Sequence, residues 1–254
     1  MSTFIAYQTI VRREVNRFMR IWLQTLLPPV ITQTLYFVIF GKFIGSQLGQ
    51  IGGISYMSFI VPGLVMMAVI NSSYSNVVSS FFSSKFQRNV EEILVSPTPS
   101  WVIMAGYVTG GVVRGVIVGA LVFSVSVFFT HPHIFNIFLI GIFILFTATV
   151  FSLGGLANGI LARNFDDVSI VPTFVLTPLT YLGGVFYSIM SLPVFWQKVS
   201  LFNPILYMVN GFRYGFYGVS DVSVIASVFI LISFTAILAL MNFYLLKNGI
   251  GLKN

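Results

Sequence analysis

Apolar residues gather in long blocks along the chain, separated by short polar segments. Six of these blocks can each cross a bilayer as a helix, because about 20 apolar residues span its hydrocarbon core. The predicted spans are residues 21–40, 56–78, 101–129, 134–161, 168–186 and 222–246. The pattern therefore predicts an all-α polytopic membrane protein with six transmembrane helices, in which residues 1–254 form a single transmembrane domain.

The segment before the first span is predicted to form an amphipathic helix in the membrane interface. Val11 and Phe18 share one helical stripe, and three arginines lie on the opposite side, Arg13, Arg17 and Arg20. Such a helix would direct its arginines towards lipid phosphate or the cytosol. An unstructured basic leader is the alternative.

Prolines interrupt two further segments. Pro28 and Pro29 lack the amide donors of a regular helix, so we expect the first span to kink or break there. Residues 187–221 are rich in aromatic side chains and are divided by Pro193 and Pro204. This composition predicts short amphipathic helices between the last two spans.

Basic residues fall mostly on one side of the predicted membrane. The side that holds both termini carries nine of them: Arg12, Arg13, Arg17, Arg20, Lys85, Arg88, Arg163, Lys247 and Lys253. The other side carries three, which are Lys42, Lys198 and Arg213. The positive-inside rule therefore predicts that both termini are cytoplasmic.

Composition argues against most other classes of protein. The 254 residues are 57% hydrophobic and only 7% charged, which is too little charge for a water-covered surface. The net charge of +7 is not gathered into a basic run, so it indicates contact with anionic membrane lipid and no nucleic acid. Cysteine is absent, and no zinc-binding helix, hydrolase motif or phosphate-binding loop occurs. We therefore expect no catalytic, cofactor or metal site in this chain.

The most polar internal segment, residues 83–100, joins the second and third predicted spans. Arg88 and Glu92 are four residues apart in it and can support a short helix. Val90, Ile93 and Leu94 would form an apolar face of this helix. Pro97 and Pro99 would end it. Such a helix is suited to act as a lever moved by a partner protein. A solvated loop helix without a partner is the equal alternative.

Two segments resemble those of ABC-2-type permeases, the transmembrane subunits of ATP-binding-cassette transporters. Arg88 with residues 91–97 looks like the family's cytoplasmic coupling helix. Residues 183–187 and 203–215 are similar to the family's segment between the fifth and sixth spans, where short helices dip into the outer leaflet. The resemblance extends over essentially the whole chain and looks closest to the YadH-type permeases of Gram-negative bacteria.

The resemblance implies a homodimer with two separately encoded ABC ATPase subunits, which would bind the ATP. It assigns contact with the ATPase to five residues: Arg88, Glu91, Glu92, Ile93 and Leu94. It also implies an exporter of an amphipathic or lipid-linked substrate in the bacterial inner membrane. A stand-alone secondary transporter or channel is the alternative. That class usually buries carboxylates in its spans, whereas all six acidic residues here lie outside the predicted spans.

The third span contains a basic residue and a row of glycines. Arg114 lies near mid-membrane, where an unpaired charge is costly, so it is expected to face the bundle or a cavity. It would meet an anionic substrate headgroup, or it would bond backbone carbonyl groups or pair with a carboxylate. Gly111, Gly115 and Gly119 repeat every fourth residue, which lets helices approach closely within one protomer or between two.

Overall fold

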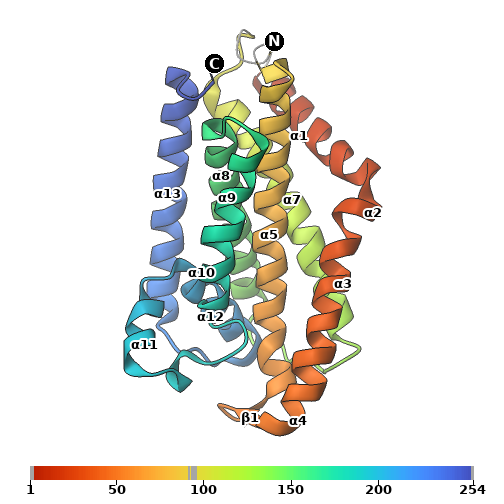
Figure 1. The fold of residues 1–254 in the computed structure, drawn as a ribbon, viewed down its shortest axis with the longest axis vertical. Coiled ribbons are helices and arrows are strands. Elements are labelled where there is room, and N and C mark those ends of the chain that lie inside the picture. Colours follow the sequence, from red (N-terminus) through yellow and green to blue (C-terminus); the bar gives the residue numbers. More distant parts are fainter. Residues whose placement is uncertain (1–2, 91, 93–95, 253–254) are drawn as a thin grey trace.

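The computed structural model describes residues 3–90, 92 and 96–252 as a bundle of long helices. Four of them run along the long axis of the molecule: α5 (Tyr56–Phe86), α7 (Ser100–Ser126), α8 (Ile137–Leu161) and α13 (Val224–Asn248). Helix α5 is the central element, because it packs against both α7 and α8 and is mostly buried. Both termini lie at the same end of the bundle (Figure 1).

The first predicted span is broken at the prolines, as expected. A single residue, Leu26, separates α2 (Trp22–Thr25) from α3 (Leu27–Tyr36). Helix α3 carries Pro28 and Pro29 in its first turn. A π-helical segment, η1 (Phe37–Ile44), continues the element. Proline is tolerated at the start of a helix because the first amides have no partner within it.

Five helical segments in the described residues are long and apolar enough to cross a membrane. They are residues 22–41 together with α5, α7, α8 and α13, so five of the six predicted spans correspond to such helices. The remaining span, predicted at residues 168–186, is a shorter helical run of α9 (Phe165–Val171), η2 (Pro172–Leu176) and α10 (Thr177–Tyr181). The chain leaves the helix before Gly184, whose φ of +70° is a left-handed conformation that suits glycine.

The loop after the first span contains a small β-hairpin that the sequence analysis did not predict. A short helix, α4 (Gly45–Leu48), precedes strand β1 (Gln50–Ile51), which pairs antiparallel with β2 (Ile54–Ser55). The turn consists of Gly52 and Gly53, with φ of +59° and +81°. A two-residue turn with positive φ at both positions is typical of tight hairpins.

The segment between α10 and α13 folds as short helices at the end of the bundle opposite the termini (Figure 1). They are η3 (Ile189–Ser191), α11 (Val194–Leu201) and α12 (Pro204–Tyr217). Arg213 of α12 is 1% exposed. Its Nη2 donates to the Gly184 carbonyl at 2.7 Å, and its guanidinium lies 3.9 Å from the centre of the Phe59 ring. Arg213 therefore ties these helices to the start of α5.

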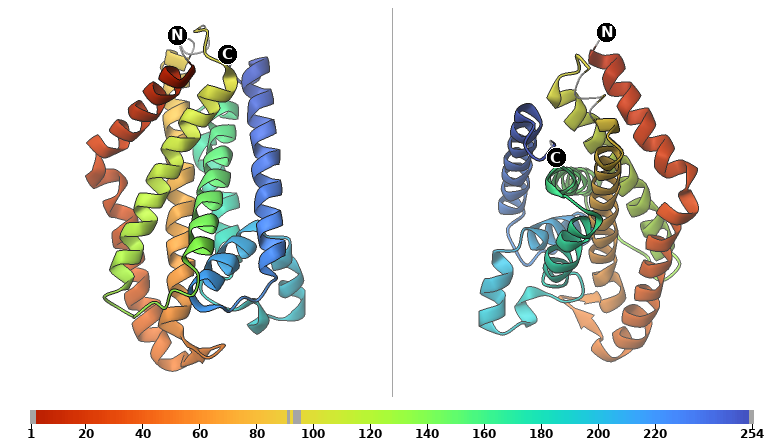
Figure 2. Two further views of the ribbon diagram at one scale, coloured as in Figure 1. Left: turned by 180° about the vertical axis from the view of Figure 1, so that it is seen from behind. Right: turned by 45° about the horizontal axis from the view of Figure 1, so that its top comes forward.

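Helix α1 (Thr3–Arg20) is inclined to the bundle and packs against α7 (Figure 2). Its arginines were predicted to face lipid phosphate or the cytosol, and two of them, both still partly exposed, also contact the bundle. Arg13 donates to the Tyr107 hydroxyl at 2.6 Å, and Arg17 donates to both oxygens of Asn76 at 2.9 Å. Close approach explains this: a Cβ on Gly110 would lie 2.5 Å from Cβ of Glu14, so only glycine lets the two helices meet.

Candidate coupling segment and intramembrane packing site

The polar segment predicted to couple the protein to a partner connects α5 to α7 at the end that carries both termini (Figure 1). Arg88 has φ of +63° and forms a turn directly after α5. Asn89, Val90 and Glu92 are helical. The predicted pairing of Arg88 with Glu92 along one helix is therefore wrong, because Arg88 lies before the helical residues in a left-handed turn.

The described residues of this segment have one buried anchor and an exposed surface. Val90 is 2% exposed and belongs to the hydrophobic cluster that also contains Ile10 of α1 and Ile103 of α7. Arg88 and Glu92 are exposed. The other three predicted coupling residues, Glu91, Ile93 and Leu94, lie outside the described residues. The segment is thus fixed to the bundle at Val90 and presents charged side chains to its surroundings.

Lys85 connects this segment to a second helix end. Its side chain is buried near the end of α5, and Nζ donates to the carbonyl oxygens of Ile160 and Ala162, both at 2.7 Å. These carbonyls lie at the C-terminal end of α8. The last carbonyl oxygens of a helix have no amide partner within it, and the helix dipole gives this end a partial negative charge. From the sequence, Lys85 was only a topology signal. The predicted span ended at residue 78, so nothing in the sequence placed Lys85 at the end of a helix.

Arg114 lies beside the proline break in the first membrane-crossing element. Its Nη2 donates to the Thr25 carbonyl oxygen at 3.0 Å. In a regular helix that oxygen would accept the amide of Pro29, which has none. Arg114 thus supplies the missing donor. Of its predicted partners, which were a substrate headgroup, backbone carbonyl groups and a carboxylate, the described contacts include a backbone carbonyl.

The glycine row of α7 faces other helices of the same chain. A Cβ on Gly111 would lie 2.5 Å from Cγ2 of Val77 in α5 and would also meet Ser152 of α8. A Cβ on Gly115 would meet the Ser73 hydroxyl. On Gly119 it would lie 2.7 Å from Cγ2 of Val69. Close packing at these positions is therefore intramolecular, between α7 and the helices α5 and α8.

A buried carboxylate on α1 was not predicted. Glu14 is 1% exposed, with an oxygen 3.4 Å from Nη2 of Arg13 and the other 3.4 Å from Nη2 of Arg17. A buried carboxylate requires such neighbouring cations. Helix α1, which carries Glu14, is not among the helices described as long and apolar enough to cross a membrane.

A bundle of several helices that are long and apolar enough to cross a membrane is typical of a polytopic membrane protein. The model of the ABC-2 type transporter family matches residues 5–217. The chain therefore belongs to the ABC-2 type transporter family.

Relatives with curated names agree with this assignment. The chain is 55% identical over 251 residues to the inner membrane transport permease YadH of Escherichia coli K12, covering 99% of this chain and 98% of YadH. It is 21% identical over 203 residues to nodulation protein J of Rhizobium leguminosarum bv. viciae, covering 80% and 78% of the two chains. The similarity to YadH extends over nearly the whole length of both proteins.

Proposed function

We propose that the chain is the transmembrane subunit of an ABC exporter in the bacterial inner membrane, working as a homodimer with two separate ATPase subunits. The substrate would be an amphipathic or lipid-linked molecule. Membership of the ABC-2 type transporter family and full-length similarity to an inner membrane transport permease support this proposal.

The observation that carries the proposal is the exposed charged segment between two long helices. It follows α5 directly and leads into α7, so a force on it would move both helices. Lys85, at its start, is hydrogen-bonded to the end of α8. Arg88 and Glu92 are exposed, and exposed charges can be paired by a partner protein. A segment so connected is suited to transmit closure of an ATPase dimer to three helices.

The proposed topology has six spans, with α9, η2 and α10 as the fifth and both termini in the cytoplasm. The nine-to-three distribution of basic residues supports this orientation. In this arrangement η3, α11 and α12 lie on the outer side. Lys85, the turn at Arg163 and the coupling segment then share the cytoplasmic end.

The test is co-expression with an ABC ATPase encoded by a neighbouring gene. We expect the two proteins to co-purify and the ATPase rate to rise in the complex. Replacing both Glu91 and Glu92 by alanine is expected to leave membrane insertion and the melting temperature unchanged. The double variant should lose either the complex or the stimulation, because it removes the acidic groups that a basic ATPase surface would pair.

A matched control removes one exposed charge at the same end, Asp166→Ala, and is expected to keep the ATPase stimulation of the unmodified complex. A Glu91→Ala/Glu92→Ala variant that assembles and stimulates hydrolysis as well as the unmodified chain would contradict the coupling role. Failure of every neighbouring ABC ATPase to co-purify would contradict the proposed function itself.

A further inference from the structure

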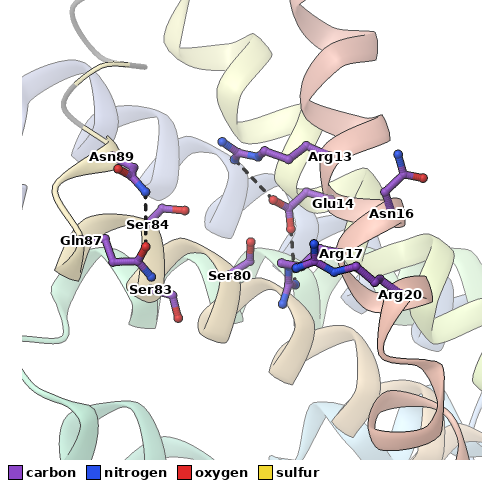
Figure 3. Close-up of a pocket in the computed structure, with 10 residues that line it drawn as sticks. All are labelled: Arg13, Glu14, Asn16, Arg17, Arg20, Ser80, Ser83, Ser84, Gln87 and Asn89. Carbon is purple, nitrogen blue, oxygen red and sulfur yellow. Dashed lines mark hydrogen bonds and ion pairs between the residues drawn. The ribbon is translucent and has the colours of Figure 1, made fainter.

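A cavity of about 510 Å³ lies between α1 and the C-terminal end of α5. Figure 3 shows its two sides: Arg13, Glu14 and Arg17 project from α1 towards serine side chains of α5 and towards Gln87, which follows α5 directly. Every residue that lines it is polar. Its size is that of a small-ligand site, and the polar ends of its lining side chains suit an occupant with polar groups.

The charge of the lining favours an anion. Three arginines face one carboxylate, that of Glu14. The two ion pairs of Glu14 are 3.4 Å long, which exceeds the about 2.7–2.9 Å of a strong charge-assisted hydrogen bond. Arg20, the third arginine, forms no ion pair or hydrogen bond within the described part of the chain. The cavity therefore carries positive charge that the protein does not neutralise.

Several hydrogen-bond donors around the cavity are unused. A serine within a helix usually donates to the carbonyl one turn earlier, as Ser79 does to Ser75 at 2.6 Å. Ser80 and Ser83 line the cavity, and neither hydroxyl bonds to another described residue. The Nε of Arg17 is buried without a partner in the described structure. Guanidinium and hydroxyl donors around one space suit a phosphate group, which has several acceptor oxygens.

Apolar surface continues directly from the rim of the cavity. The residues after Arg20 are exposed although they are large and apolar: Ile21 is 40% exposed, Trp22 51% and Leu23 58%. A polar cavity next to an exposed apolar strip fits a molecule with a charged head and apolar chains. A soluble anion would use only the cavity.

We propose that this cavity binds the phosphate of an amphiphile headgroup, with Arg20, Ser80 and Ser83 as donors and the chains along α2. The amphiphile is a phospholipid on the side of the termini, and the test below separates it from a soluble phosphate compound. Binding itself does not depend on the proposed export function. Because Asn89 of the coupling segment also lines the cavity, a bound phosphate would connect α1 to that segment.

The test uses the full-length chain purified in detergent, with native mass spectrometry and thermal unfolding as readouts. The probes are phosphatidic acid, diacylglycerol with the same acyl chains, and inorganic phosphate. We expect phosphatidic acid to bind and to raise the melting temperature, and diacylglycerol to do neither. Arg20→Gln is expected to weaken the binding of phosphatidic acid about tenfold, the loss of one charge-assisted hydrogen bond. Ser83→Ala should weaken it in the same direction.

The matched control is Arg12→Gln, which removes the same charge from an exposed position of α1 that does not line the cavity. It is expected to bind phosphatidic acid like the unmodified chain. Stabilisation by inorganic phosphate alone that Arg20→Gln removes would identify a soluble phosphate as the source. Equal binding by Arg20→Gln, Ser83→Ala and the unmodified chain would overturn the proposal, and so would equal binding of diacylglycerol and phosphatidic acid.

Discussion

Three basic side chains of the bundle donate to backbone carbonyl groups at helix ends or breaks. Lys85 donates to Ile160 and Ala162 at the end of α8, and Arg114 donates to Thr25 beside the proline break. Arg213 donates to Gly184, just after α10. Helix ends and breaks leave carbonyl oxygens without amide partners. A cation placed there donates to those acceptors, although Nε of Arg114 stays without a partner among the described residues.

The Arg114 contact can be tested through its proline. Arg114→Leu leaves the Thr25 carbonyl without a donor and is expected to destabilise the fold by about 1–3 kcal/mol. Pro29→Ala restores an amide that can bond the same oxygen. We therefore expect Pro29→Ala to recover part of the loss in the Arg114→Leu background, measured by thermal unfolding in detergent.

The double-mutant cycle of Arg114→Leu and Pro29→Ala tests whether Arg114 bonds the Thr25 carbonyl or binds an anionic substrate. Additive losses for Arg114→Leu and Pro29→Ala would contradict a shared acceptor. Arg114→Lys keeps a donor and is expected to lose less stability than Arg114→Leu. If Arg114 instead bound an anionic substrate, the leucine variant would lose transport at unchanged melting temperature.

Helix α7 packs closely against three other helices, because glycines occur on two of its faces. Gly106 and Gly110 admit α1, with Ile10 and Glu14 close to their α-carbons. The row of Gly111, Gly115 and Gly119 admits α5 and α8. Small residues let backbones approach, which is the main source of helix association where lipid surrounds the protein.

Gly115 is the position where this close approach is most easily tested. Its added Cβ would meet the Ser73 hydroxyl, which can rotate away, and would lie 3.4 Å from the carbonyl oxygen of Val69. We expect Gly115→Ala to be mildly destabilising and Gly115→Leu to cost about 1–3 kcal/mol or more, because overpacking forces the helices apart. Thermal unfolding in detergent measures both.

Gly141 of α8 provides the control for that comparison, since a Cβ there would meet nothing within 4 Å. Gly141→Leu is expected to unfold at nearly the same temperature as the unmodified chain. If Gly115→Leu and Gly141→Leu had the same unfolding temperature, the close packing of α7 on α5 at Gly115 would not contribute to stability.

At the scale of the whole molecule, the arrangement of helices fixes which segments share a side of the membrane. Both termini lie at one end, and the β-hairpin and α11 lie at the other (Figure 1). The chain contains no cysteine, so single cysteines can be introduced without first removing others. We expect Gln87→Cys and Arg163→Cys to react only from the cytoplasm, and Gln50→Cys and Lys198→Cys only from outside.

The pair Arg163 and Lys198 decides whether α9, η2 and α10 cross the membrane, because this helical run lies between them. Labelling of both positions from the same side would contradict a sixth span. A membrane-impermeant maleimide applied to intact cells and to inverted vesicles gives the readout. Gln50, exposed on β1, serves as the positive control for the outer side.

The sequence by itself determined the class of protein, the long helices and the proline break. These features depend on composition and on local backbone chemistry: apolar blocks long enough for a bilayer, and prolines without amides. It also predicted a charged segment between the second and third spans, although Glu91, Ile93 and Leu94 lie outside the described residues. The family resemblance to ABC-2-type permeases is confirmed by the match over residues 5–217.

The tertiary structure alone decided which side chains meet. Periodicity placed Arg13 and Arg17 on the polar side of α1, and only the packing of α1 on the bundle shows that they donate to Tyr107 and Asn76. The tertiary structure also places the Lys85 side chain against the end of α8, and it packs the glycine row of α7 against helices of the same chain. These contacts join residues far apart in sequence, so they depend on how helices pack, and the period of a single helix carries no information about its neighbour.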